Sequence, residues 1–262
     1  MEKTLAALKS YWILILIVVL FAAGLIGYFA GYRLDQGGIT RVGTLVLTGL
    51  PDGTAVYLDQ ARRVYASDGT AHSDFLPGTH SVIVDSPGNQ PWNELFTISP
   101  SEQTTLAPIF VPVTLAARPL SGEDAARGLA LVRAAKLPTK AAPLTLADGC
   151  TLLYASGARL IADAATSSCA VLPEYLCAPD AAGCASTIVY SAAEPIRSVA
   201  AFPGRDDALV VVTGHLVFVL EVDPREPQFF APLFKGPTIG AAPYSASSTV
   251  ITNGTTVVEI EL

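Results

Sequence analysis

The pattern of apolar and polar residues divides the chain into one long uncharged stretch and a β-type remainder. Residues 11–32 read YWILILIVVLFAAGLIGYFAGY, and none of these 22 residues carries a charge. A helix rises about 1.5 Å per residue, so this stretch is long enough to cross the ~30 Å hydrocarbon core of a bilayer. The pattern therefore predicts a transmembrane helix over 11–32, preceded by a short tail over 1–10.

Aromatic residues lie at both ends of the uncharged stretch, where amphipathic rings favour the membrane–water interface. They are Tyr11 and Trp12 at one end, and Tyr28 and Tyr32 at the other. A cleaved signal peptide is the alternative, but its apolar core normally has about 7–15 residues and small residues precede the cut. The best cut here follows Ala30 and leaves the bulky Tyr28 three residues before it. We therefore expect a retained anchor.

Small residues recur on one side of the predicted helix. Gly27 and Gly31 form a Gly-x-x-x-Gly pair, and Ala23 lies one turn before them. Such a face can let two helices pack closely, but small residues are also common in spanning helices in general. Homo-oligomerisation through Ala23, Gly27 and Gly31 is therefore one hypothesis, and a spanning helix without a partner helix is the other.

Residues 41–112 alternate short apolar runs with turn residues. The apolar runs are 44–48, 55–58, 81–84 and 95–98. Sequences rich in Pro, Gly and Asp separate the runs, and these residues favour tight turns. Short strands at this spacing are typical of a small all-β sandwich.

The same segment resembles the PEGA family. It contains GTLVLTGLPDGTAVYLD and LPGTHSVIVDSPGNQPW, which are similar to that family's turn and strand pattern. The matching positions are Pro51, Gly53, Val56, Tyr57, Asp59, Leu76, Gly78, His80, Val82 and Val84. The sequence departs from the pattern at Asp52, Thr54 and Asn89, and at Gln60, where Gly is usual. The resemblance implies a small envelope-facing β domain over 41–112 that has no catalytic role and acts beside other domains.

Residues 113–142 are rich in Ala, Leu and Pro and show no strand pattern, so they are expected to form a linker. A short helix over 121–136 is expected within the linker. Ser121 is a suitable N-cap for it, and Glu123 and Asp124 favour its first turn.

The C-terminal region, residues 143–262, contains an internal repeat. Residues 200–222 align with 240–262 at an offset of 40, and a degenerate copy lies at 150–163. Hairpins at this spacing resemble the blades of WD-repeat-like β-propellers. A closed propeller needs about four to eight blades, and this region holds fewer than three. We therefore expect an incomplete propeller, folded as a blade-like β-meander, with a ring completed by another chain as the alternative.

All four cysteines lie beyond the predicted anchor, within 35 residues: Cys150, Cys169, Cys177 and Cys184. An even, clustered set suggests two disulfides in an oxidising compartment. Cys177 and Cys184 bracket a short loop, and Cys150 with Cys169 would then be the remaining pair, but the sequence does not fix the connectivity because four cysteines allow three pairings. Zinc binding is an alternative, although the gaps lack the usual Cys-x2–4-Cys spacing. Four free thiols are the other alternative.

The cysteines and the short N-terminal tail together favour an orientation across the cell membrane. The N-terminus is expected in the cytoplasm and the β domains are expected outside it. Lys and Arg do not decide the orientation, because they are nearly balanced on the two sides of the span.

The net charge and the absence of known motifs argue against several classes of function. The net charge is −7, which argues against a nucleic-acid partner because phosphate contacts need a basic face. The sequence contains no catalytic or phosphate-binding motif, so no enzyme activity, catalytic residue, metal site or cofactor is predicted. We expect a single-pass membrane protein whose β domains bind another envelope protein or a surface polymer. The alternative is an accessory subunit or enzyme with a propeller-like substrate-binding face.

Overall fold

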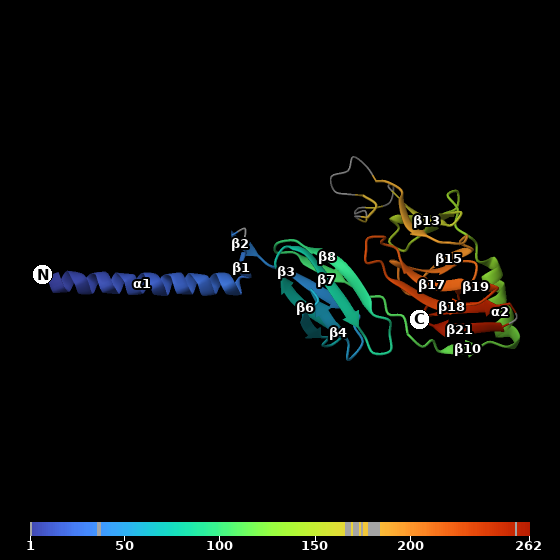
Figure 1. Cartoon of the computed structure of the whole chain (residues 1–262), viewed down its shortest axis with the longest axis horizontal. Helices are drawn as coiled ribbons and strands as arrows, with labels where there is room; N and C mark the ends of the chain where they lie inside the picture. The colour runs from blue at the N-terminus through green and yellow to red at the C-terminus, as the bar shows by residue number, and fades with distance from the viewer. Residues whose placement is uncertain are drawn as a thin grey trace. The chain divides into compact units, whose positions relative to one another are not determined.

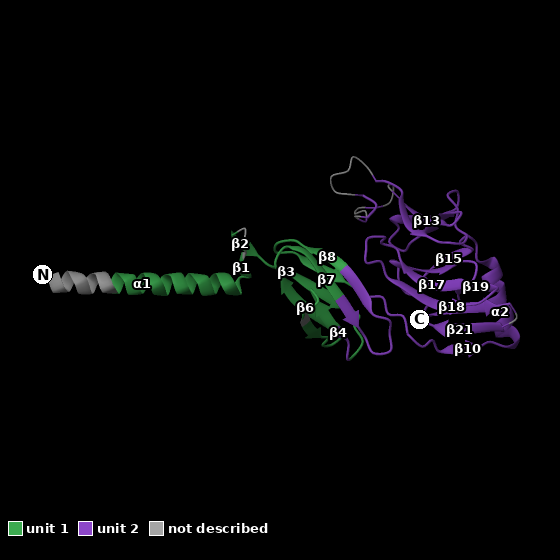
Figure 2. Ribbon diagram, viewed as in Figure 1, with its two compact units in different colours: residues 1–52, 56–82, 95–107 green, residues 53–55, 83–94, 108–262 purple. Residues whose placement is uncertain are grey.

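The structure is a computed structural model and is mainly β, with one apolar N-terminal helix, as the sequence predicted (Figure 1). It describes residues 2–35, 38–165, 169, 173, 175–177, 184–254 and 256–262. The chain forms two compact units (Figure 2). Unit 1 contains residues 1–52, 56–82 and 95–107, and unit 2 contains residues 53–55, 83–94 and 108–262.

Helix α1 spans Glu2–Phe29. Its segment Tyr11–Phe29 is long and apolar enough to cross a membrane, with a mean hydropathy of 2.7. The helix ends three residues before the predicted limit because Gly31 adopts a φ of 82°, a left-handed conformation that is common just beyond helix ends. Tyr32 then begins β1 (Tyr32–Asp35), which pairs antiparallel with β2 (Gly38–Arg41).

Seven further strands of the first part of the chain form two sheets. One sheet has the order β6-β3-β9, in which β3 pairs antiparallel with β6 and parallel with β9. The other has the order β5-β4-β7-β8, and it contributes residues to both units. The strands are β3 (Gly43–Thr48), β4 (Ala55–Leu58), β5 (Arg62–Tyr65), β6 (Thr70–Phe75), β7 (Gly78–Asp85), β8 (Trp92–Ile98) and β9 (Gln103–Leu106). The four predicted apolar runs all fall within these strands.

Unit 2 contains three four-stranded antiparallel sheets with the orders β11-β12-β13-β14, β15-β16-β17-β18 and β10-β21-β20-β19. The first sheet consists of β11 (Leu144–Thr145), β12 (Thr151–Ser156), β13 (Arg159–Ala164) and β14 (Thr187–Ser191). The second consists of β15 (Ser198–Ala201), β16 (Ala208–Val212), β17 (Leu216–Glu221) and β18 (Phe230–Lys235). The third consists of β10 (Ala117–Pro119), β19 (Ile239–Pro243), β20 (Ser248–Asn253) and β21 (Thr256–Glu261).

The predicted repeat corresponds to equivalent strands of two sheets. β16 and β17 in the first copy match β20 and β21 in the second, and β12 and β13 represent the degenerate copy. In the third sheet the fourth strand is β10, which pairs with β21 and comes from the segment predicted to be a linker. The described residues therefore supply three complete sheets, and these do not form a closed propeller.

The central strand β16 of the second sheet is buried on both faces, since every one of its residues is buried. Its side chains Leu209 and Phe218 share a core with Leu153 and Leu160 of the first sheet. On the third sheet, Val250 and Val257 pack against helix α2 (Gly122–Ala134), which lies inside the predicted range 121–136. Ser121 is its N-cap residue, although the Ser121 side chain makes no capping hydrogen bond.

Candidate functional site

Both predicted disulfides are confirmed, Cys150 with Cys169 and Cys177 with Cys184. Leu176, next to Cys177, joins the core that contains Leu153 and Leu160 of the first sheet of unit 2. The hydroxyl of Tyr175 lies 3.2 Å from Thr151 Oγ1, and burial raises the pKa of this tyrosine to about 12. The four cysteines therefore have a structural role in this fold.

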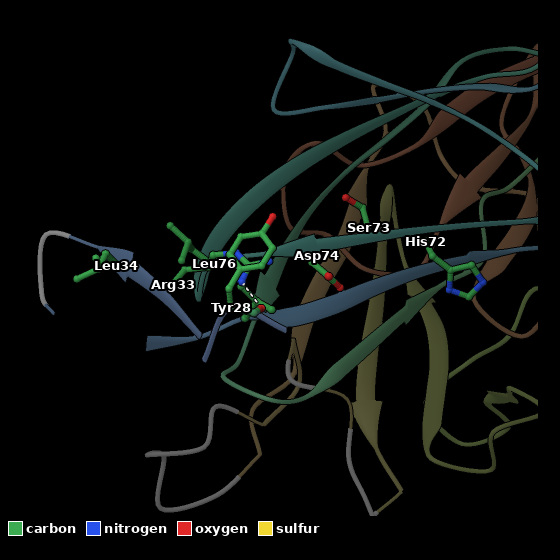
Figure 3. Close-up of a pocket in the computed structure, with 8 residues that line it drawn as sticks. Tyr28, Arg33, Leu34, His72, Ser73, Asp74 and Leu76 are labelled. Carbon is green, nitrogen blue, oxygen red and sulfur yellow. Dashed lines mark hydrogen bonds between the residues drawn. The ribbon is translucent and has the colours of Figure 1, made fainter. Parts of the chain in front are cut away.

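A cavity of about 620 Å³ lies where α1, the β1–β2 hairpin and strand β6 meet in unit 1 (Figure 3). It is lined by Tyr28, Arg33, Leu34, Val42, His72, Ser73, Asp74 and Leu76. The sequence predicted a role only for Tyr28 among them. The lining is mixed, because apolar side chains from the helix end and the hairpin face polar groups on β6.

Arg33 is a positively charged side chain that lines this cavity. Its guanidinium lies 3.9 Å from the centroid of the Tyr28 ring. Its Nη1 atom donates hydrogen bonds to the carbonyl oxygens of Tyr28, at 2.7 Å, and Tyr32, at 3.0 Å. The last carbonyls of a helix lack donors within the helix and carry partial negative charge, so Arg33 neutralises the end of α1.

The polar side of the cavity contains no activated nucleophile among its described residues. Side chains alternate along a strand, so Ser73 is buried while His72 and Asp74 are exposed, and Ser73 and Asp74 point to opposite sides of β6 (Figure 3). The buried Ser73 hydroxyl has no hydrogen-bond partner among the described residues. Asp74 Oδ1 accepts a hydrogen bond from Thr44 Oγ1 at 2.9 Å. Ser73 and His72 therefore do not form a nucleophile–base pair.

An apolar groove of about 460 Å³ adjoins the same hairpin. It is lined by Ala23, Gly24, Gly27, Tyr28, Tyr32, Arg33, Leu34 and Ile39. Ala23 and Gly27 of the predicted packing face thus border the groove. Gly31 lies beyond α1, and a Cβ atom there would be 3.3 Å from Val42 Cγ2. The prediction that Gly31 belongs to a helix face is therefore corrected, because this glycine forms the turn after the helix.

The four aromatic residues predicted to lie at the membrane interface are all exposed. Their exposed fractions are 67% for Tyr11, 68% for Trp12, 56% for Tyr28 and 46% for Tyr32. Tyr32 belongs to β1 and not to the helix. Their place at a membrane surface stays a prediction.

Glu94 lies near the carboxylates of Glu221 and Asp223 in unit 2. Burial, together with the nearby charges of Glu221 and Asp223, raises the pKa of Glu94 to about 8. Burial also raises the pKa of Glu221 to about 7, although this carboxylate accepts a hydrogen bond from the Phe229 N–H at 3.1 Å. Among the described residues, no three His, Cys, Asp or Glu side chains are arranged to hold a metal ion.

Comparison with protein-family models and with the curated proteins finds no match to this chain. The function must therefore be argued from the sequence and from the geometry of the molecule.

Proposed function

We propose that this protein is a single-pass membrane protein with extracytoplasmic β domains that bind another envelope protein or a surface polymer without catalysis. The observation that carries the proposal is the exposed apolar surface of Tyr11–Phe29. Its large side chains are exposed by between 42%, at Leu25, and 83%, at Phe29. Apolar surface left in water costs roughly 25 cal/mol per Å², so this exposed surface supports an apolar environment such as a bilayer for the helix.

The two disulfides support the extracytoplasmic position of the β domains. Disulfides persist in oxidising compartments and are rare where cellular thiols are kept reduced. With α1 as the membrane crossing, the N-terminus then lies in the cytoplasm. Unit 2, which carries both disulfides, lies on the other side.

The β architecture supports a role in binding. We propose that the two sheets of residues 41–112 form a PEGA-like sandwich, and that the sheets of residues 143–262 form a blade-like meander. Two of the histidines contact carboxylates. His80 Nδ1 lies 2.9 Å from Asp59, and His215 Nδ1 lies 2.8 Å from Glu194.

Membrane retention and topology test the proposal together. The full chain should stay in the membrane fraction after alkaline extraction, with its N-terminal sequence intact. Protease added from outside the cell should digest unit 2 and leave a small membrane-bound fragment. Recovery of a mature chain that begins after Ala30 would show a cleaved signal peptide and contradict the anchor.

A matched pair of variants isolates the contribution of the helix. Leu20→Arg places a charge within the apolar span, where insertion costs about 2.5–3.5 kcal/mol, so retention should fall. Ala130→Arg places the same charge on the exposed side of α2, so retention should be unchanged. Equal retention of both variants would contradict the membrane span.

Binding is tested by in-cell photo-crosslinking of the full chain. A crosslinker at position 230, where Phe230 is 41% exposed, should give a discrete adduct with an envelope protein or polymer. Adducts that contain only lipid or only the chain itself, from this position and from exposed Ile188, would contradict the proposed partner class.

A further inference from the structure

We propose that the β1–β2 hairpin lies in the membrane surface beside α1, with Tyr32, Leu34 and Ile39 inserted into the leaflet from which the helix emerges. The inference rests on the proposed membrane anchor. It goes beyond that anchor by adding a second membrane contact and by assigning the apolar groove to a lipid acyl chain.

The strand register places the apolar side chains on one face of the hairpin. Leu34 pairs with Ile39, and Tyr32 pairs with Arg41. Because side chains alternate along each strand and paired residues point to the same side, the apolar Tyr32, Leu34 and Ile39 share one face, with Arg41 at its helix-proximal end, while Arg33 and Thr40 lie on the other. Leu34 is 84% exposed and Ile39 is 73% exposed. An isolated two-stranded hairpin is only marginally stable in water, so this uncovered apolar face needs an apolar partner.

The cavities show that this face is turned toward the apolar span. The groove of about 460 Å³ is bordered by Tyr32, Leu34 and Ile39 from the hairpin and by small residues of α1, among them Ala23 and Gly27. The mixed cavity of about 620 Å³ shares Tyr28, Arg33 and Leu34 with the groove and includes His72 and Asp74 of β6. The hairpin therefore borders both an apolar groove beside the helix and a mixed cavity beside strand β6.

The connection to the helix keeps the hairpin at the membrane surface. Only Ala30 and Gly31 separate the end of α1 from β1, and two residues reach at most about 7 Å. If Tyr11–Phe29 spans the bilayer, β1 begins within the interfacial region of the same leaflet.

The groove has room for a lipid chain along the helix. Cβ atoms built at Gly24 and Gly27 would meet nothing within 4 Å, so the missing side chains leave room along the helix. Arg33, stacked on Tyr28 at the helix end, places a cation where lipid phosphates lie, as interfacial Arg and Tyr commonly do. A second copy of α1 packed on Ala23 and Gly27 is the competing occupant, and the experiment distinguishes it from lipid.

The test uses the full chain in phosphatidylcholine nanodiscs. A single cysteine, labelled with the environment-sensitive fluorophore NBD while the native disulfides stay oxidised, is placed at position 34 or 39. The control positions are 40, on the opposite face of the hairpin, and 65, where Tyr65 is 62% exposed in β5. All four side chains lie on the surface or at an intermediate depth, so labelling leaves the core intact. Intact disulfides and an unchanged circular dichroism spectrum verify the fold.

We expect the labels at 34 and 39 to be shielded from iodide in the water and quenched by nitroxide lipids, at a depth of about 5–10 Å. Labels at 40 and 65 should be quenched by iodide and should not be quenched by the nitroxide lipids. Iodide quenching at 34 and 39 as strong as at 65 would overturn the proposal. Shielding from both quenchers would also overturn it, because a second protein copy would then cover the groove. Failure of the chain to co-elute with the nanodiscs would instead contradict the anchor itself, so the two failures are distinguishable.

Discussion

His80 and Asp59 are joined by a contact of 2.9 Å between Nδ1 and Oδ2, which connects β7 to the turn after β4. The other ring nitrogen of His80 lies 2.8 Å from the carbonyl oxygen of Leu76. Asp59 Oδ1 also accepts a hydrogen bond from the Ser81 N–H at 3.0 Å. These contacts tie the turn after β4 to strand β7.

We predict that His80→Ala lowers the free energy of unfolding by about 1–3 kcal/mol, because the Leu76 carbonyl loses its partner and the ring contact with Phe75 is lost. Urea denaturation of the full chain in detergent measures the change. His72→Ala, on an exposed position of neighbouring β6, is the matched control and should change stability by less than about 0.5 kcal/mol. Equal effects of the two variants would show that the His80 contacts do not stabilise the fold.

The turn between β4 and β5 contains two non-glycine residues in the left-handed region, Asp59 with a φ of 49° and Gln60 with a φ of 62°. A left-handed residue other than glycine costs roughly 1–2 kcal/mol. We therefore predict that Gln60→Gly raises the thermal midpoint. Gln103→Gly in strand β9 should lower it, since glycine destabilises strand interiors by about 0.5–1 kcal/mol. A lower midpoint for Gln60→Gly would contradict this interpretation of the turn.

Local patterns in the sequence predicted much of the fold but not its long-range pairing. The apolar runs, the cluster of four cysteines and the repeat at 200–222 and 240–262 are all visible over short distances. Strand β10 is not, because Ala117–Pro119 has no strand pattern and pairs with β21 about 140 residues later along the chain. Its register is supported by the ion pair of Arg118 with Glu259.

The sequence predicted only part of the region where α1 meets the β1–β2 hairpin. The small and aromatic residues were identified, but the uncharged run was extended to Tyr32, because hydropathy does not show that Gly31 ends the helix. The hairpin of residues 32–41 was therefore missed. Arg33 is a single flanking cation in the sequence, and only the fold shows that it binds the carbonyls at the end of α1.

Gly128 allows α2 to pack closely on the third sheet of unit 2. A Cβ atom at this buried position would lie 2.9 Å from Val250 Cγ2 and 3.0 Å from Val257 Cγ1. We predict that Gly128→Val destabilises the protein by about 1–3 kcal/mol through overpacking, despite the better helix propensity of valine. Ala130→Val on the exposed side of the same helix should cost less than about 0.7 kcal/mol. Thermal denaturation compares the two variants, and equal midpoints would contradict close packing at Gly128.

The raised pKa values of Glu94 and Glu221 predict that the free energy of unfolding falls as the pH rises. Burial first, and then neighbouring carboxylates, raise the folded-state pKa of Glu94 to about 8, and burial raises that of Glu221 to about 7. Both start from an ordinary value of 4.5. Between about pH 4.5 and 8 the folded protein therefore binds more protons than the unfolded chain, so the free energy of unfolding decreases as the pH increases. The thermal midpoint should be higher near pH 5 than near pH 8.5.

Substitution of Glu94 tests whether this carboxyl group causes the change of the thermal midpoint with pH. Glu94→Gln keeps the size of the side chain and removes the buried charge, so it should raise the midpoint near pH 8.5 and flatten the slope between about pH 4.5 and 8. Glu123→Gln, on an exposed carboxylate in the first turn of α2, should leave the slope unchanged. The measurement is differential scanning fluorimetry of the wild type and both variants across this pH range. A wild-type midpoint that rises with pH, or an equal slope in Glu94→Gln, would show that the environment of Glu94 does not favour its protonated form.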